Sequence, residues 1–272
     1  MLFYRGHTDK KVQNMTQSLH PAAQQGFSSA AELYQQARPD YPAAITPWLQ
    51  QHLNLSEHAR LLDLGAGTGK FLNYIKPLNQ HITAVEPVAE MLAELQKKHP
   101  HIETLAARSD NIPLNNQSIH AVFCAQSFHW FANRETLHEI ARVLKPEGYL
   151  VLIWNQRDIS VDWVNALANI VNALEGDTPR YHSGEWRKAF EQQTTFQLSA
   201  ETTFKQPHQG TVEQVVSNRL LSTSFIAALP SAEQQRLKQQ FEQIVEQYTG
   251  KTAHDDIVFP YITHVYVFKK IS

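Results

Sequence analysis

LLDLGAGTGK, residues 61–70, is the stretch on which the fold of this 272-residue chain depends. It begins with an apolar run that predicts a buried strand, and three glycines at alternate positions then predict a tight turn leading into a helix. Glycine tolerates positive φ and has no Cβ, so the backbone of such a turn can approach a ligand closely. Asp63, near the end of the strand, is placed to accept a hydrogen bond from an ammonium group. The stretch predicts a ligand site, and the simpler alternative is an ordinary strand-to-helix turn.

The spacing of the glycines separates two classes of cofactor. The dinucleotide fingerprint is G-x-G-x-x-G, and its third glycine would fall at Lys70. The pattern here is G-x-G-x-G, which lacks the cradle for a pyrophosphate and is better suited to an uncharged sugar and an amino-acid tail. The residues assigned to cofactor binding from this stretch are Asp63, Gly65, Ala66, Gly67 and Gly69.

A second acidic residue follows the glycine turn. HITAVEP, residues 81–87, reads as a short strand with Glu86 at its C-terminal end and Pro87 after it. In nucleotide-binding α/β folds an acidic side chain at this point binds a ribose, because its two oxygens match two neighbouring hydroxyls. The alternative is a solvated loop carboxylate, which the nearby glycine turn makes less favoured. Glu86 and Pro87 are therefore added to the predicted cofactor site.

Four segments together resemble the motifs of a known family. They are residues 61–70, Glu86-Pro87, NIPL at residues 111–114 and IARVLKPEG at residues 140–148. With them the chain resembles the class I S-adenosylmethionine-dependent methyltransferases.

Two more stretches resemble a subgroup of that superfamily. Tyr34 with RPDYP at residues 38–42, and AQSFHWF at residues 125–131, are similar to segments of the small-molecule methyltransferases related to trans-aconitate methyltransferase. The specific motifs cover residues 26–157, and the resemblance extends more loosely to the C-terminus.

The resemblance implies a fold and a division of the chain. The implied fold is α/β, a Rossmann-like seven-stranded mixed sheet of order 3-2-1-4-5-7-6 with the last strand antiparallel, helices on both faces and a helical cap inserted around strand 6. We expect an N-terminal arm over residues 1–25 and a single methyltransferase domain over residues 26–272. Its cofactor-binding core would span about 55–157, and the helical cap and C-terminal strands about 158–272.

Hydrophobic periodicity and turn residues predict the other elements. The further strands are predicted at 102–106, 118–125, 149–154, 196–205 and 257–269. The helices are predicted at 28–36, 43–53, 88–99, 137–144, 161–174, 212–221, 225–229 and 232–248, with a turn at 146–148.

Composition narrows the class of partner. The formal net charge is −2 and the pI is near 6.7, which gives no basic surface for nucleic acid or an anionic membrane. Cys124 is the single cysteine, so an intrachain disulfide and a multi-cysteine zinc site are excluded, and its apolar surroundings predict a buried structural thiol. No apolar stretch reaches transmembrane length, and residues 1–20 lack the apolar segment of a signal peptide. We expect a cytoplasmic protein with a small-molecule acceptor and no metal, acting as a monomer or a homodimer.

The resemblance also implies cofactor contacts outside the glycine turn. Tyr34 and Arg38 are candidates for the methionine carboxylate, since the arginine fork matches two oxygens; the alternative is a packing tyrosine and a surface arginine. Near the adenine amino group the family commonly has an acidic residue, but here Arg108 stands where aspartate is frequent. We assign the adenine contact to Ser109 and Asp110, and add Gln126 at the exit of the 118–125 strand.

The acceptor site is predicted where strands end, because the crevice of an open α/β sheet lies beyond the strands' carboxyl ends. The residues assigned to it are Phe128, His129, Trp130, Trp154, Asn155, Arg157 and Arg219. His129 is the candidate catalytic base for a hydroxyl or ammonium acceptor, or a group that positions the acceptor, and the alternative is a hydrogen-bonded structural histidine. A carboxylate acceptor would need no base, and Arg157 or Arg219 would orient it.

These residues predict an S-adenosylmethionine-dependent methyltransferase. The methyl group would pass by in-line displacement to a small-molecule acceptor, with an oxygen nucleophile, carboxylate or hydroxyl, preferred by resemblance. Two alternatives stay open at this point: a non-catalytic S-adenosylmethionine-binding regulator and, with less support, a nicotinamide-dependent dehydrogenase.

Overall fold

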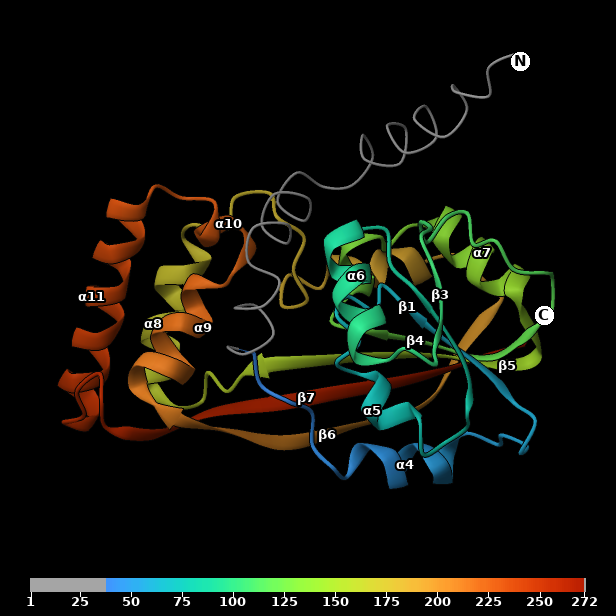
Figure 1. The fold of residues 1–272 in the computed structure, drawn as a ribbon, viewed down its shortest axis with the longest axis horizontal. Coiled ribbons are helices and arrows are strands. Elements are labelled where there is room, and N and C mark those ends of the chain that lie inside the picture. Colours follow the sequence, from blue (N-terminus) through green and yellow to red (C-terminus); the bar gives the residue numbers. More distant parts are fainter. Residues whose placement is uncertain (1–37, 272) are drawn as a thin grey trace, which may run out of the picture.

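A seven-stranded mixed sheet forms the centre of the computed structural model, which describes residues 38–271 (Figure 1). The strands are β1 (Arg60–Leu64), β2 (His81–Val85), β3 (Glu103–Leu105), β4 (Ile119–Ala125), β5 (Leu144–Arg157), β6 (Phe196–Thr211) and β7 (Asp256–Lys270). Their order is β3-β2-β1-β4-β5-β7-β6, and β7 runs antiparallel to both of its neighbours, β5 and β6. The sheet predicted from the sequence is therefore confirmed in order and in direction.

Helices cover both faces of the sheet, because its central strands are apolar on both sides. The helices are α4 (Ile45–His52), α5 (Leu72–Ile75), α6 (Ala89–Lys98), α7 (Arg134–Val143), α8 (Asp162–Asn172), α9 (Asn218–Leu221), α10 (Ser224–Ala227) and α11 (Ser231–Thr249), with short 3₁₀ helices η1 (Phe128–Trp130) and η2 (Glu185–Phe190) and a π-helix η3 (Glu213–Ser217). In β1, Leu61 packs into one hydrophobic core with α4 and α5, while Leu62 packs into the other with α7 and η2.

A third hydrophobic core lies away from the sheet's centre. It joins α8, η3, α9 and α11 to the first residues of β7, where Phe259 and Tyr261 are buried. Figure 1 shows these helices gathered at one end of the molecule, with β6 and β7 running from them into the sheet. Since η3, α9, α10 and α11 lie between β6 and β7 in the chain, the predicted helical cap around strand 6 is confirmed. We call this part the helical lobe and the rest the sheet lobe.

Three strands are longer than their apolar runs indicated. β6 and β7 extend beyond the sheet lobe as a two-stranded ribbon, with register pairs continuing to Thr211 and Asp256. Alternation of exposed and half-buried residues along β6 lets polar side chains belong to a strand there. The turn predicted at 146–148 is wrong: β5 continues through it with an irregularity in its register, and Glu147 adopts φ +63°.

The helix predicted at 137–144 begins three residues earlier, at Arg134. Asn133 caps it, because its side-chain oxygen accepts a hydrogen bond from the backbone N–H of Thr136 at 2.8 Å.

Cys124 is fully buried in β4, as predicted for a structural thiol. The predicted arm at 1–25, the helix at 28–36 and Tyr34 lie outside the described residues.

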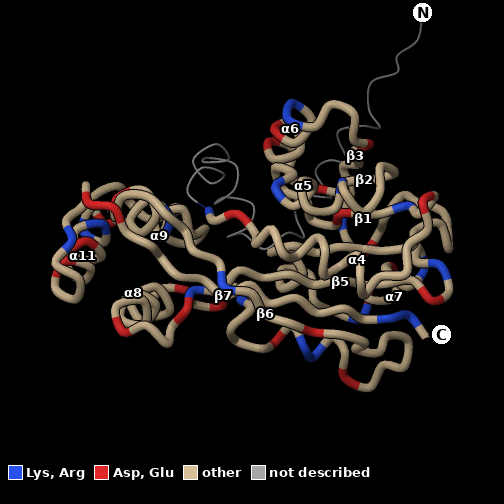
Figure 2. The backbone as a smooth tube through the Cα atoms, turned by 90° about the horizontal axis from the view of Figure 1, so that it is seen from below, with Lys and Arg blue, Asp and Glu red and all other residues tan. Residues whose placement is uncertain are grey.

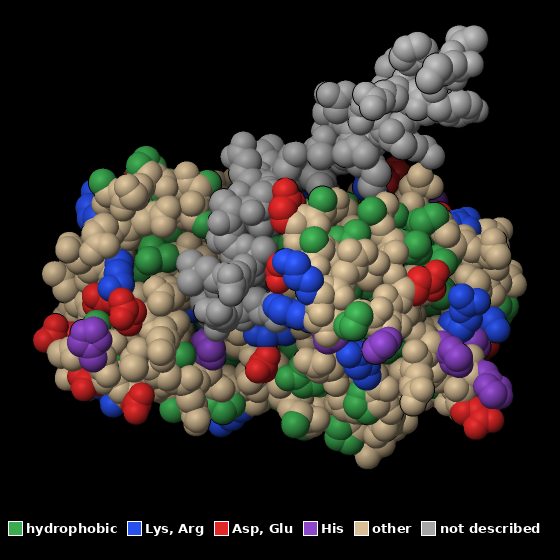
Figure 3. Space-filling model, viewed as in Figure 1, with side chains coloured by type: hydrophobic (Ala, Val, Ile, Leu, Met, Phe, Trp, Pro, Cys, Tyr) green, Lys and Arg blue, Asp and Glu red, His purple; other side chains and the backbone are tan. Residues whose placement is uncertain are grey.

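Charges of both signs are spread along the chain, including on α11 (Figure 2). On the face seen in Figure 3, basic, acidic and hydrophobic side chains of the described residues are interspersed. Within residues 38–271, no helix combines the length and the apolar character needed to cross a bilayer.

Candidate functional site

A cavity opens where β1, β2 and β4 end. This edge is where parallel strands of an open α/β sheet leave a crevice, because the helices that follow them turn to opposite faces. The lining combines the glycine turn, the end of β2, the exit of β4 and parts of the flanking segments: Arg38, Pro39, Tyr41, Asp63, Gly65, Ala66, Gly67, Thr68, Lys70, Phe71, Glu86, Pro87, Val88, Met91, Ala125, Gln126, Ser127, Trp130, Phe131, Asn155 and Arg219. We call it the cofactor cavity.

The three glycines of the turn all have positive φ, but the space around each of them differs. A Cβ on Gly65 would lie 2.6 Å from the Cβ of Ser127, so this glycine allows two strand exits to approach each other. A Cβ on Gly69 would lie 2.7 Å from the ring of His99 and 3.0 Å from Leu95, and Gly69 does not line the cavity. Gly67 alone has open space, its nearest neighbour being Met91 Sδ at 3.7 Å. The ligand-facing glycines are thus Gly65 and Gly67, whereas Gly69 packs against α6.

Glu86 is fixed by the turn it faces. Its Oε2 accepts a hydrogen bond from the N–H of Gly67 at 2.8 Å, and its Oε1 accepts one from the N–H of Val88 at 2.9 Å. Burial raises the pKa of Glu86 to about 7, and these two hydrogen bonds oppose that shift. Each oxygen keeps a lone pair for a further donor. The carboxylate is therefore oriented before any ligand arrives, as a group that binds a diol requires.

Asp63 is a buried carboxyl whose two oxygens lack a hydrogen-bond partner among the described residues. Burial, and secondly the charge of Glu86, raise its pKa to about 7. An unsatisfied carboxyl group beside a cavity is costly unless a ligand supplies a donor or a positive charge. S-adenosylmethionine supplies both on its ammonium and sulfonium groups, so these residues fit that cofactor.

The segment around Arg38 closes one side of the cofactor cavity. Lys70 donates a hydrogen bond to the backbone carbonyl of Arg38, and its Nζ lies 3.3 Å from Asp40 Oδ1. The lysine that occupies the third-glycine position of the dinucleotide fingerprint thus anchors this segment over the turn. Arg38 Nη2 also lies within 3.5 Å of the Ser222 carbonyl, which connects the segment to the helical lobe.

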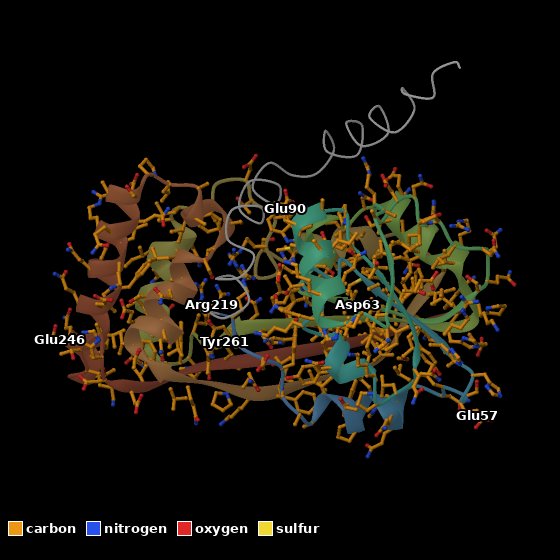
Figure 4. The ribbon with its side chains drawn as sticks, in the orientation of Figure 1. Glu57, Asp63, Glu90, Arg219, Glu246 and Tyr261 are labelled. Atoms are coloured by element: carbon orange, nitrogen blue, oxygen red, sulfur yellow. The ribbon has the colours of Figure 1, made fainter. Side chains whose placement is uncertain are left out.

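A second cavity adjoins the first and shares five lining residues with it: Arg38, Gln126, Trp130, Asn155 and Arg219. Its other lining residues are His129, Gln156, Arg157, Arg180, Tyr181, Thr223, Ser224 and Tyr261. We call it the arginine cavity. Figure 4 shows Arg219 and Tyr261 near each other toward the helical lobe, with Asp63 in the sheet lobe.

The arginine cavity carries four guanidinium groups. Burial lowers the pKa of Arg157 to about 10 and that of Arg180 to about 9, and repulsion from neighbouring arginines adds to both effects. Arg219 has its Nε and Nη1 buried with no acceptor in the described part of the chain. Such a cluster favours an anion, because each guanidinium can donate two parallel hydrogen bonds to one oxyanion.

His129 lines the arginine cavity with its ring orientation fixed. The indole Nε1–H of Trp154 donates to its Nδ1 at 3.0 Å. Since Nδ1 accepts this bond, the proton of the neutral ring lies on Nε2. Burial, and secondly Arg180, Arg38 and His182, lower the pKa of His129 to about 3. The ring is therefore a neutral hydrogen-bond donor, and its predicted role as a base does not agree with this geometry.

Similarity to known proteins shows the family to which this chain belongs. The model of the methyltransferase domain family matches residues 62–152. Over 245 residues the chain is 36% identical to an uncharacterized methyltransferase-like protein of Schizosaccharomyces pombe, a match covering 90% of this chain and 95% of that protein. The chain belongs to the S-adenosylmethionine-dependent methyltransferases.

A second relative and a solved structure are also similar to the chain, the first in sequence and the second in fold. The methyltransferase is 38% identical over 154 residues to an uncharacterized methyltransferase of Mycobacterium tuberculosis, which is 57% of this chain and 61% of that protein. A proposed type II methyltransferase from Anaeromyxobacter dehalogenans has the same fold, with a TM-score of 0.66 at 16% identity over 86% of this chain and 98% of that one. Membership of the methyltransferase family, shown by the relative from Schizosaccharomyces pombe, does not agree with the alternative of a nicotinamide-dependent dehydrogenase.

Besides Gly69, four described residues assigned from the sequence lie outside both cavities of the methyltransferase. Phe128 and Trp154 are fully buried in the sheet lobe's core, where Trp154 packs 4.8 Å from the ring of Trp186. Ser109 is hydrogen-bonded to Thr136 at 3.1 Å, and Asp110 is ion-paired with Arg108. Phe128 and Trp154 are therefore corrected from acceptor contacts to core residues, and the structure gives Ser109 and Asp110 no place on the cofactor cavity.

Two predicted lining residues are held by internal contacts. Gln126 has φ +60°, an uncommon conformation for a residue other than glycine, and its side chain donates to the Asn155 carbonyl at 3.2 Å. Asn155 donates to the Asp40 carbonyl at 3.1 Å and accepts from Thr263 at 2.6 Å. Both residues line the two cavities, and they brace the wall between β4, β5 and the segment around Arg38.

Sequence reasoning missed Lys70, Arg180 and Tyr261 as site residues. Lys70 could have been found from the sequence, because it stands where the dinucleotide fingerprint has its third glycine and its charged side chain is unusual at that position. Arg180 lies in the loop between α8 and η2, and Tyr261 pairs in register with Arg157. Neither has a local motif, and only the folded topology brings them to the arginine cavity.

Proposed function

We propose that this methyltransferase transfers a methyl group to a carboxylate oxygen of a small anionic molecule. The observation that carries the proposal is the arginine cavity, which adjoins the cofactor cavity and contains four guanidinium groups. Arg38 and Arg219 line both cavities, so an anionic acceptor held by them lies at the junction, next to the cofactor. The resemblance to methyltransferases related to trans-aconitate methyltransferase supports the same acceptor class.

The state of His129 separates a carboxylate from a hydroxyl acceptor. A hydroxyl must lose its proton, and a base must be within reach to take it. Nδ1 of His129 is occupied by the Trp154 N–H, and Nε2 already carries a hydrogen. The imidazole is therefore suited to donate a hydrogen bond to an acceptor carboxylate and unsuited to remove a proton.

The chain's own residues bind and orient both reactants. Glu86 and Asp63 would hold the ribose and the ammonium group, while Arg219 and His129 would direct one carboxylate oxygen of the acceptor toward the cofactor cavity. When bound, S-adenosylmethionine supplies a methyl group on positively charged sulfur; an O–CH₃ bond forms, the S–CH₃ bond breaks with its electron pair left on sulfur, and no proton moves. Positioning of this kind contributes on the order of 7–11 kcal/mol in favourable systems.

The proposal is tested with matched acceptors. Purified protein would be incubated with S-adenosylmethionine and pairs of small molecules of equal length, one a carboxylic acid and the other its primary alcohol, with phenols as a third class. Methyl esters, detected by mass spectrometry together with S-adenosylhomocysteine, are the expected products. Transfer to alcohols or phenols alone would contradict the carboxylate assignment. Tight cofactor binding without transfer to any acceptor would support the non-catalytic regulator instead.

A further inference from the structure

The four arginines of the arginine cavity occupy two different places. Arg38 and Arg219 line both cavities, whereas Arg157 and Arg180 line only the arginine cavity. An anion held next to the cofactor by Arg219 therefore leaves a second pair of guanidinium groups beside the part of the cavity that the cofactor cavity does not share.

Arg157 projects from the end of β5, directly opposite Tyr261 on β7. Burial lowers the pKa of its guanidinium, and the nearby Tyr261 and Glu175 oppose only part of this effect. The hydroxyl of Tyr261 is buried and has no partner in the same part of the chain. A cation and this hydroxyl donor thus lie on one wall of the cavity.

Arg180 is held in place by contacts with Glu175 and Phe225. Its Nε lies 3.9 Å from Glu175 Oε2, and its guanidinium stacks 5.5 Å from the ring centre of Phe225. Glu175 also contacts His182 at 3.1 Å. One carboxylate is thus shared by two basic groups, and it balances only part of the positive charge of the cavity.

Clustered, largely buried cations destabilise a fold unless an anion compensates them. Burial lowers the pKa values of Arg157 and Arg180, and repulsion from Arg219 adds to the effect on both, which is the environment in which a bound anion stabilises the cations. Two guanidinium forks and a hydroxyl together offer several donors, enough for a carboxylate or a phosphate group.

We propose that Arg157, Arg180 and Tyr261 form a second anionic subsite, which binds a carboxylate or phosphate group of the same substrate molecule that presents its other carboxylate to the cofactor. The substrate class is therefore a small molecule with two anionic groups. This inference rests on the proposed function, since it takes the reacting group to be the carboxylate at Arg219.

Binding measurements test the subsite without turnover. Protein saturated with S-adenosylhomocysteine would be titrated by calorimetry with succinate, glutarate and adipate, each compared with the monocarboxylate of the same carbon number. Phosphonoacetate against malonate distinguishes a phosphate-type from a carboxylate second group. We expect at least one dianion to bind roughly 10-fold to 100-fold more tightly than its single-charge match.

Substitutions assign the preference to the two arginines. Arg157→Gln and Arg180→Gln should each reduce the dianion preference by roughly tenfold or more. Binding of S-adenosylhomocysteine should be unchanged, because neither residue lines the cofactor cavity. Arg180→Lys, which keeps the charge, should retain part of the preference. Arg134→Gln is the matched control, because Arg134 is exposed on α7 and lines neither cavity. Unchanged S-adenosylhomocysteine binding also shows that a variant is folded.

The outcomes separate the inference from the proposed function. Equal binding of mono- and dicarboxylates, or a dianion preference that survives both glutamine variants, would overturn the subsite and leave methyl transfer to a carboxylate standing. Binding of S-adenosylhomocysteine with no binding of any carboxylate would overturn both. A dianion preference lost in both glutamine variants and kept in Arg134→Gln would support the subsite.

Discussion

Trp154 donates its indole N–H to Nδ1 of His129 at 3.0 Å, from a position fully buried in the sheet lobe's core. The tryptophan therefore sets the tautomer of a histidine that lines the arginine cavity. Because the ring is neutral with its proton on Nε2, it presents a hydrogen-bond donor to the cavity. This relationship makes Trp154, predicted as an acceptor contact, a positioning residue for His129.

Nitrogen NMR of histidine-labelled protein tests this tautomer. We expect the signal of His129, identified by its loss in His129→Gln, to show a protonated Nε2 and an unprotonated Nδ1. It should not titrate down to about pH 5, because burial and neighbouring cations lower its pKa to about 3. In Trp154→Phe the fixed tautomer should be lost. Titration of the wild-type ring near pH 6.5, its usual range, would contradict the assignment.

Kinetics of two substitutions at His129 distinguish a donor from a base. His129→Gln keeps an N–H donor at a similar reach, so we expect turnover close to wild type. His129→Ala removes the donor and should raise the KM for the acceptor by roughly tenfold, with a smaller effect on kcat. A loss of kcat by a factor of about 100 or more in both variants would instead indicate that the ring removes a proton.

Cofactor affinity should depend on pH through Asp63 and Glu86. The pKa of each is raised to about 7, so both are partly protonated near neutrality, while the positive charges of S-adenosylmethionine favour the ionised form. Affinity should therefore rise with pH below about 7, by up to roughly tenfold per pH unit for each carboxyl that must lose its proton, and level off above it. Calorimetry in buffers of different ionisation enthalpy should also detect proton release on binding.

Asp63→Asn is the control for this pH dependence. The amide cannot titrate and has nearly the same shape, so the slope of affinity against pH should become shallower. An unchanged slope in Asp63→Asn would assign the titration to Glu86 or to another group, and a flat profile in the wild type would contradict the shifts themselves.

Two glycines with nearly equal φ separate steric from conformational requirements. Gly65 has φ +71° and its added Cβ would lie 2.6 Å from Ser127, whereas Gly250 has φ +72° with open space around it. We expect Gly250→Ala to cost about 1 kcal/mol of unfolding free energy and Gly65→Ala about 2–4 kcal/mol. Urea unfolding measures both. Equal losses would show that the approach of Ser127 is not the constraint on Gly65.

The cofactor half of the site could be read from the sequence because its parts are local. Gly65, Gly67 and Glu86 follow two consecutive strands, and the pairing of β1 with β2 brings them together. Among the three turn glycines, only Gly69 differs in role, since its conformation serves packing against His99 and Leu95. The sheet order was implied by the family resemblance, and local patterns alone did not give it.

The arginine cavity could be read only in part, because its residues come from distant segments. Arg157 and Arg219 were found as cations after a strand and within a predicted helix, but nothing in the sequence relates Arg180 to either. The alternating polar pattern of β6 also concealed its full length, which carries the ribbon to the helical lobe. The residues of the arginine cavity are brought together by the topology of the fold, so patterns within single segments of the sequence could not predict the whole cavity.

Methyl transfer to a carboxylate is tested most directly by the chemical stability of the labelled product. The protein would be given S-adenosylmethionine labelled in its methyl group, together with a small-molecule extract as the source of acceptors, and the products would then be treated with mild alkali. Methyl esters hydrolyse under these conditions, so the account predicts that the transferred label is released as volatile methanol. Label that stays bound to the acceptor after alkali, as in an ether or an N-methyl or C-methyl product, would contradict it.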